Sequence, residues 1–120
     1  MTKYTAEFRK KLERVIAIIS GYKIIIDKIY MFGSFAYGTP HEYSDIDLLI
    51  IVSDEMGNLF RMIDIMNIMQ TNIWDAGIDS VDLIVETSSH FEKRCKMPTI
   101  ENTIFEKGMV IYDKGKYVGV

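Results

Sequence analysis

The sequence is poor in the residues that build disulfides, zinc clusters and linkers. Its 120 residues include one cysteine, two prolines and two histidines. A single cysteine, Cys95, excludes an internal disulfide and is consistent with a reducing cytoplasmic location, which we expect. His41 and His90 are not at ligand spacing from one another, so we expect no zinc. Without a linker-like tract, residues 1–120 are predicted to form a single domain.

Long apolar runs and excess positive charge are also lacking. No apolar run approaches the ~20 residues that span a bilayer, and the N-terminus lacks the apolar segment of a secretory signal. We therefore expect no membrane partner. The formal net charge is −3, whereas proteins that hold nucleic acid through its phosphates are usually basic. Nucleic acid is not an expected partner, and any contact with phosphate should be local or mediated by a metal.

What the chain does have is apolar residues, 48% of the total, arranged in helical and strand patterns. Thr5 and Gly21 fit the two ends of a first helix, and a short helical start follows Gly33. Further helices are predicted over 58–75, 88–96 and 99–107, and strands over 23–32, 45–52, 79–86 and 109–113, the last strand.

The predicted helix over 58–75 has a wide apolar stripe. Its members are Leu59, Met62, Ile63, Met66, Met69 and Ile73. Most of these side chains should fill the core. If the stripe is wider than one sheet can cover, the remainder should form a protein interface.

Two acidic residues interrupt the apolar strand over 45–52. Asp45 and Asp47 are two positions apart, so both side chains point to one face while Ile46 and Leu48 point to the other. Neighbouring unpaired carboxylates repel each other and raise a pKa. A hard divalent cation removes that repulsion, and Mg²⁺ prefers carboxylate oxygen. The pair alone also fits a solvated edge face, which is the commoner meaning of Asp-x-Asp.

Other residues complete this arrangement. Asp82, in the strand over 79–86, is the natural third carboxylate if that strand lies beside the strand over 45–52. Gly33 and Ser34 follow the first strand where a helix begins, and the free N–H groups of a helix start bind phosphate. Gly-Ser alone usually marks only a turn. A phosphate-binding turn followed by a metal-binding pair indicates a nucleotide with its metal.

The stretch "GSFAYGTPHEYSDIDL" resembles the minimal nucleotidyltransferase family of the DNA polymerase beta-like superfamily. The shared signature is Gly-Ser, about ten residues, then Asp-x-Asp, and the tight match covers 33–51. The resemblance implies an α+β fold, with a small mixed sheet flanked by helices. It also implies a Mg²⁺-dependent enzyme that transfers a nucleoside monophosphate to an acceptor hydroxyl and releases pyrophosphate. We expect the transferred group to be AMP from ATP.

The same resemblance implies roles for individual residues. The expected nucleotide-binding residues are Gly33, Ser34 and Ser44, and the expected ligands of two Mg²⁺ ions are Asp45, Asp47 and Asp82. Asp82 would also help to deprotonate the acceptor hydroxyl. One position departs from the family pattern, because Tyr37 stands where an arginine is usual. Either a lysine from elsewhere supplies that charge, or nucleotide binding is weak, or the site has lost part of its activity.

The resemblance further implies a partner protein. Members of the family are commonly the antitoxin of a two-gene module whose other product carries a HEPN domain, and some members adenylylate that partner. So short a chain fits a protein acceptor better than a small antibiotic. The alternative is a non-catalytic module that neutralises its partner by contact, through the apolar face of the methionine-rich helix, with a vestigial nucleotide site. An RNA 3′-end modifier is disfavoured by the acidic charge, and a homodimer is left open.

Overall fold

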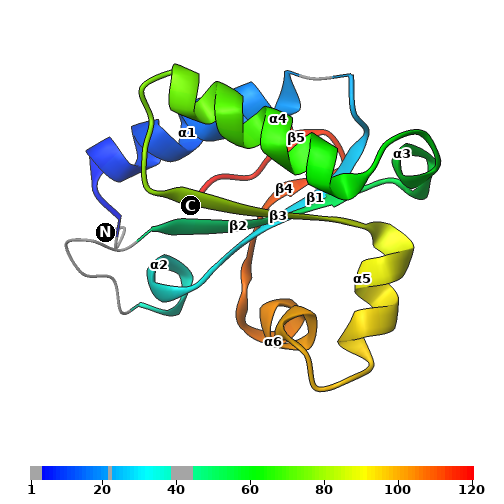
Figure 1. The fold of residues 1–120 in the computed structure, drawn as a ribbon. Helices are drawn as coiled ribbons and strands as arrows, with labels where there is room; N and C mark the ends of the chain where they lie inside the picture. The colour runs from blue at the N-terminus through cyan, green and yellow to red at the C-terminus, as the bar shows by residue number, and fades with distance from the viewer. Residues whose placement is uncertain (1–3, 22, 39–44) are drawn as a thin grey trace.

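The computed structural model describes residues 4–21, 23–38 and 45–120, and Figure 1 shows their arrangement. The helices of this part are α1 (Ala6–Ser20), α2 (Ser34–Tyr37), α3 (Asp54–Leu59), α4 (Met62–Asp75), α5 (Ser88–Cys95) and α6 (Ile100–Lys107). Its strands are β1 (Ile26–Phe32), β2 (Ile46–Val52), β3 (Val81–Thr87), β4 (Met109–Asp113) and β5 (Lys116–Tyr117).

The strands form one mixed sheet. Their order is β3-β2-β1-β4-β5. β1 pairs antiparallel with both β2 and β4, and β4 pairs antiparallel with β5, whereas β2 and β3 are parallel. Parallel neighbours need a crossover connection, and here α3 and α4 supply it. The predicted α+β class, with a small mixed sheet flanked by helices, is confirmed.

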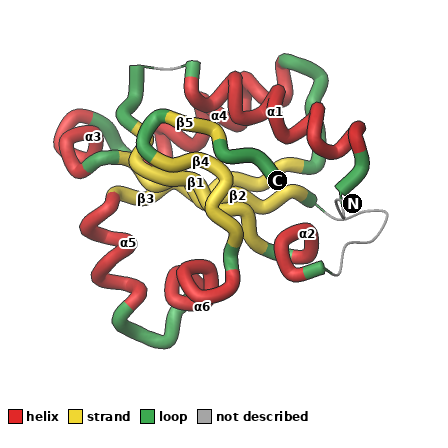
Figure 2. The backbone as a smooth tube through the Cα atoms, turned by 180° about the vertical axis from the view of Figure 1, so that it is seen from behind, coloured by secondary structure: helices red, strands yellow, loops and turns green. Residues whose placement is uncertain are grey.

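Helices cover both faces of the sheet (Figure 1, Figure 2). α1 and α4 lie over one face, where a large core includes Ile46, Leu48 and Ile50 of β2. α5 and α6 lie over the other, where a smaller core includes Leu49 and Ile51. Because β2 is buried on both faces, it needs a nearly continuous apolar sequence.

The first helix forms where the sequence predicts it. Thr5 is its N-cap, and the Thr5 hydroxyl oxygen accepts a hydrogen bond from the backbone N–H of Phe8 (3.0 Å). Gly21 is its C-cap. The side chains that it buries are Leu12, Val15, Ile16 and Ile19. α1 has 15 residues, and among the described residues no helix is both long and apolar enough to cross a membrane.

The predicted helix over 58–75 is wrong in one respect, because the chain forms two helices there. α3 ends at Leu59, and both Phe60 and Arg61 have extended backbone before α4 begins. This break changes which face is buried. Ile65, Met69 and Ile73 are buried, but Leu59 and Ile63 are 68% and 45% exposed, so these two are not part of the core stripe.

The C-terminal end also differs from the prediction. β4 is not the last strand, since Lys116 and Tyr117 turn back and pair with Asp113 and Tyr112. Gly115, with φ +85°, lies in the turn that joins the two strands. Two residues form too short a pattern to stand out in a sequence.

Candidate active site

The turn between β1 and α2 requires a glycine at position 33. Gly33 is the N-cap of α2 and has φ +75° and ψ −162°, a conformation that side chains disfavour. A Cβ at this position would also overlap Oδ2 of Asp47. The Gly33 backbone therefore lies directly against the Asp47 carboxylate. The Gly33 carbonyl accepts a hydrogen bond from the N–H of Tyr37 (3.0 Å), which closes the single turn of α2.

Aromatic side chains from α1 and from the residue before its N-cap hold this turn in place. The Phe8 and Phe35 rings stack with centroids 4.6 Å apart, and Tyr4 stacks on Phe8 at 5.0 Å. The Tyr4 hydroxyl donates a hydrogen bond to the Phe35 carbonyl (2.8 Å). Stacked aromatic pairs contribute beyond their buried area. α1 therefore fixes the position of α2 and of the glycine before it.

The three predicted carboxylates meet at one end of the parallel strand pair. Asp45 is exposed and directly precedes β2, and Asp47 is half-buried within it. Asp82, exposed on β3, is the register partner of Asp47. The N–H of Ile46 donates to the Ser80 carbonyl (2.8 Å), which aligns the starts of the two strands. The structure thus confirms that the strand carrying Asp82 lies beside the strand carrying Asp47.

These carboxylates repel one another. Burial raises the pKa of Asp47, and the charges of Asp82 and Asp45 raise it further. Burial also raises the pKa of Asp82, and a side-chain hydrogen bond with Asp45 and the charge of Asp45 add to the shift. Within the described part of the chain, no ion pair involves any of the three. Their negative charge is concentrated at one place, which is what a bound cation needs.

The other predicted site residues lie close to this end of the sheet or outside the described residues. Ser34 is half-buried and is the first residue of α2, directly after Gly33. Tyr37 is exposed and is the last residue of α2. Ser44 and His41 lie outside the residues that the structure describes.

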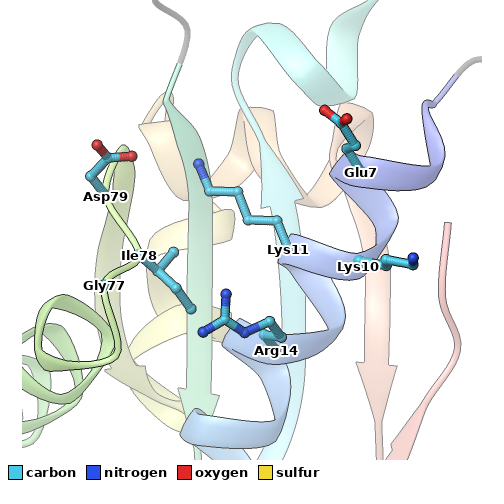
Figure 3. Close-up of a pocket in the computed structure, with 7 residues that line it drawn as sticks. All are labelled: Glu7, Lys10, Lys11, Arg14, Gly77, Ile78 and Asp79. Carbon is cyan, nitrogen blue, oxygen red and sulfur yellow. The ribbon is translucent and has the colours of Figure 1, made fainter.

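A basic cavity next to this end of the sheet is a feature that sequence reasoning missed. Figure 3 shows Lys11 and Arg14 extending from α1 toward the loop before β3, whereas Lys10 points away from that loop, and all three residues line a cavity of about 420 Å³. The Arg14 guanidinium donates to the Ala76 carbonyl (3.1 Å). The spacing of the three cations along one helix was the available signal, because residues three and four apart share a helix face. Asp79 and Glu7 also line the cavity.

Comparison with known proteins gives a consistent result. The family profile described as "Polymerase beta, Nucleotidyltransferase" matches residues 13–117. The curated Protein adenylyltransferase MntA of Shewanella oneidensis is 36% identical over 55 residues, which are 46% of this chain and 38% of that protein. The match therefore spans less than half of that relative's length.

Solved structures share the fold. A protein from Sulfolobus solfataricus described as a nucleotidyltransferase has a TM-score of 0.63 and 19% identity, over 92% of this chain and 85% of its own. A toxin–antitoxin complex with AMP-PNP has a TM-score of 0.53 and 19% identity, over 84% and 72% of the two chains. A mutant of the toxin–antitoxin pair MntA-HpeT has a TM-score of 0.57 and 18% identity over the same shares.

The family match covers almost the whole of the sheet and the helices that pack on it. It includes the turn at Gly33 and the acidic strand ends that carry Asp47 and Asp82. On this basis the chain belongs to the polymerase beta nucleotidyltransferase family.

Proposed function

We propose that this protein is a Mg²⁺-dependent enzyme that transfers AMP from ATP to a hydroxyl group of a partner protein. The observation that carries the proposal is the register of β2 and β3, which sets Asp47 opposite Asp82 beside the Gly33 turn. The arrangement combines a cluster of repelling carboxylates with a glycine turn that a nucleotide phosphate can approach closely. The comparisons support this proposal, because one relative is a protein adenylyltransferase and one similar complex holds AMP-PNP.

The chemistry of the carboxylates fits a metal. All three donors are carboxylate oxygens, and burial together with neighbouring negative charge raises the pKa of Asp47 and of Asp82, which a divalent cation would reverse. Asp45, Asp47 and Asp82 would therefore hold Mg²⁺. When bound, the ions supply charge stabilisation for the phosphate oxygens and orient the triphosphate.

The protein's own groups then have distinct tasks. The backbone at Gly33 and the Ser34 hydroxyl would bind the triphosphate, and Ser44 is proposed to assist them. Asp82 would accept the proton of the acceptor hydroxyl as its oxygen attacks the α-phosphorus. The bond from that phosphorus to the bridging oxygen breaks, and pyrophosphate leaves. A raised pKa makes the ionised Asp82 a stronger base than an ordinary aspartate.

The proposed acceptor is a HEPN-domain protein encoded with this chain as a toxin, and the reaction is placed in the cytoplasm. Support comes from the toxin–antitoxin complexes that share the fold and from the unpaired Cys95, which suits a reducing compartment. AMP on a hydroxyl adds a charged, bulky group, which can block an active site or an interface.

A second candidate function is neutralisation of the partner by contact alone. The observation that favours it is a group of large apolar side chains left exposed around α4. They are Leu59, Phe60, Ile63, Ile68 and Trp74. Exposed apolar groups of this kind often mark protein interfaces.

One experiment separates the two candidates. Cells that express the partner are given the wild-type protein, Asp45→Ala with Asp47→Ala, or Ser34→Ala, and survival is measured while mass spectrometry follows AMP on the partner. The enzyme proposal expects the double variant to fold but to lose both protection and the mass shift. Ser34→Ala should lose less, because the backbone donors and metal ligands remain. Full protection by the double variant, with no mass shift in the wild-type pair, would refute transfer to this partner.

A further inference from the structure

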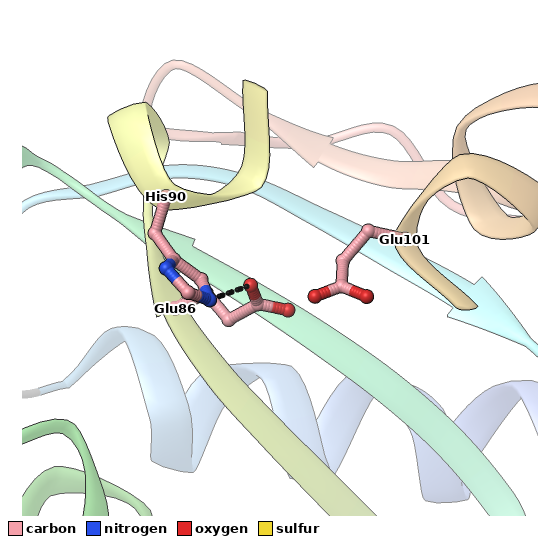
Figure 4. Close-up of side chains that lie close together, drawn as sticks. All are labelled: Glu86, His90 and Glu101. Atoms are coloured by element: carbon pink, nitrogen blue, oxygen red, sulfur yellow. Dashed lines mark ion pairs between the residues drawn. The ribbon is translucent and has the colours of Figure 1, made fainter. Parts of the chain in front are cut away.

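A second cluster of acidic and imidazole groups lies away from the proposed nucleotide site (Figure 4). Glu86 comes from β3, His90 from α5 and Glu101 from α6. One possible ligand atom of each lies within 4.8 Å of those of the other two. Glu86 lies four residues beyond Asp82 on β3, which corresponds to about 13 Å along a strand. The cluster is therefore separate from the carboxylates at the strand starts.

The two glutamates are buried with oxygens left unpaired. Glu86 and Glu101 are only 8% and 5% exposed. Among the described residues, neither Glu86 Oε1 nor Glu101 Oε1 has a hydrogen-bond partner. His90 Nε2 lies 3.2 Å from Glu86 Oε1, which is an ion-pair distance, but the contact lacks hydrogen-bond geometry. Leaving buried carboxylate oxygens unpaired is costly, so these atoms are well placed to hold a ligand.

The surrounding groups contact Glu101 at its other oxygen and at its backbone. Arg94 Nε donates to the other oxygen of Glu101, Oε2 (3.2 Å), and so balances one of the two negative charges. The Cys95 thiol is directed at the Glu101 backbone carbonyl (3.6 Å). Glu86 and Glu101 also share a side-chain hydrogen bond, so a bound ion would replace the proton that lies between the two carboxyl groups. The cluster therefore offers two carboxylate oxygens and an imidazole nitrogen at one point.

We propose that Glu86, His90 and Glu101 bind a divalent transition-metal ion, for which Zn²⁺ is the best match. Imidazole nitrogen and carboxylate oxygen are both ordinary zinc ligands at about 2.0–2.2 Å, whereas Mg²⁺ takes oxygen ligands. The donors must close in slightly from their present separation. The His90 side chain is 57% exposed, so it can rotate toward the glutamates and leave a coordination position for water.

Such an ion would join three elements that pack around the smaller core. β3, α5 and α6 would be tied together by Glu86, His90 and Glu101. A ligand that binds only the folded protein raises its stability by mass action. The bound ion would thus act as a structural clamp on the sheet face that carries Asp82.

Calorimetric titration of Zn²⁺ into the full chain tests the proposal, with saturating Mg²⁺ present to fill the proposed nucleotide site. The wild-type protein should bind one Zn²⁺ and melt at a higher temperature. His90→Ala and Glu101→Gln should each lose at least about tenfold in Zn²⁺ affinity, since even groups that only orient a ligand contribute that much. Asp45→Asn with Asp47→Asn should bind Zn²⁺ as the wild type does.

Matched controls identify the ligands. Glu92→Gln removes a carboxylate from the same helix as His90, and His41→Ala removes the only other histidine of the sequence. Both should bind as the wild type, and so should Cys95→Ser. Loss of binding in His41→Ala or Cys95→Ser would overturn the assignment. So would the absence of Zn²⁺ uptake by the wild type, or equal uptake by His90→Ala and Glu101→Gln.

The variants are chosen to keep the fold. Glu101→Gln retains an oxygen that can accept the bond from Arg94, and His90 is exposed. Circular dichroism checks that each variant is folded. If Glu101→Gln fails to fold, His90→Ala alone decides the question.

Discussion

Two glycines flank the four residues of α2, and only one of them touches the proposed catalytic residues. Gly33→Ala should lower stability by about 1–3 kcal/mol, because its backbone conformation is nearly exclusive to glycine. The added Cβ would also displace the Asp47 carboxylate. We expect thermal denaturation to show the stability loss, and titration with Mg²⁺ and a non-hydrolysable triphosphate to show loss of binding.

Gly38 provides the matched control. It also has positive φ, +82°, but a Cβ there would meet nothing within 4 Å. Gly38→Ala should cost about 1–2 kcal/mol for the left-handed backbone and leave nucleotide binding nearly intact. If Gly33→Ala binds the nucleotide as well as Gly38→Ala does, the contact with Asp47 has no role in binding.

Tyr37 is the position that departs from the family pattern. It is exposed on the last residue of α2. Tyr37→Arg should tighten triphosphate binding about tenfold, because a hydrogen bond to a charged group contributes roughly 1.5–3 kcal/mol. Calorimetry measures the change, with Tyr37→Gln as the uncharged control. Unchanged affinity in Tyr37→Arg would indicate that another cation already serves the phosphates.

Glu86 makes the stability of the protein depend on pH. Burial raises its pKa from 4.5 to about 7, the charge of Glu101 adds to the shift, and Arg94 opposes it. Between these pH values the folded protein holds a proton that the unfolded chain has released. The stability from neutral Glu86 is therefore complete below pH 4.5 and is lost as the pH rises through about 7.

Glu86→Gln cannot ionise and should avoid this loss. In the presence of a chelator, its advantage over the wild type in unfolding free energy should grow with pH across that window. At about 1.4 kcal/mol for each pKa unit, the gain should be on the order of 1–3 kcal/mol.

Glu101 does not cancel this gain in stability. Burial alone would raise the pKa of Glu101, but hydrogen bonds from its own backbone, from Arg94 and from Glu86 lower it, so the stability that depends on Glu101 is lost only as the pH falls below 4.5. Denaturant unfolding with parallel pH curves for both proteins would contradict the prediction.

At the scale of elements, the contact between α1 and α2 determines how well the nucleotide turn is supported. Phe8→Ala removes the ring that stacks on both Tyr4 and Phe35. It should lower stability by about 1–2 kcal/mol through lost burial and weaken triphosphate binding as well. Ile18→Ala is the control, because Ile18 packs on the large core from the same helix. An equal loss of affinity in both variants would show that α2 needs no support from Phe8.

The sequence predicted some elements well and others poorly, for physical reasons. α1 has a cap, a regular apolar face and a terminal glycine, so both of its ends could be predicted from the sequence. The break at Phe60 and Arg61 could not be predicted from the sequence, because apolar residues continue through it and no proline marks it. The cluster of Glu86, His90 and Glu101 was missed for a different reason. Glu101 meets Glu86 and His90 only because α6 packs beside α5 on the sheet, and sequence spacing does not show tertiary packing.

At the scale of the whole molecule, the proposed site joins parts of the chain that are distant in sequence. Asp45 and Asp47 indicated a metal site in combination with the turn at Gly33 and Ser34, and Asp82 was added on the condition that β3 lies beside β2. The structure confirms that adjacency. The basic cavity at Lys10, Lys11 and Arg14 was missed, because the loop that faces α1 could not be placed from the sequence.

Metal and nucleotide should stabilise the whole fold. Three repelling carboxylates reduce the stability of the metal-free protein, and Mn²⁺ with a triphosphate should raise the melting temperature by mass action. Asp45→Asn with Asp47→Asn should melt slightly higher than the wild type without ligand and gain little when ligand is added. A full ligand-induced rise in this variant would mean that the metal binds elsewhere. Scanning calorimetry provides the comparison.

The parallel pairing of β2 with β3 has a consequence for how the chain folds. The two strands are joined through α3 and α4, so their register forms only after this long crossover has closed. Non-local parallel pairing is slow because the entropy of loop closure is lost before the contacts form. Asp47 and Asp82 are therefore far apart in a partly folded chain, and such a chain cannot assemble the proposed triad. A nascent or damaged copy would be inactive until its topology is complete, so nucleotide binding can serve as a kinetic probe of the final folding step.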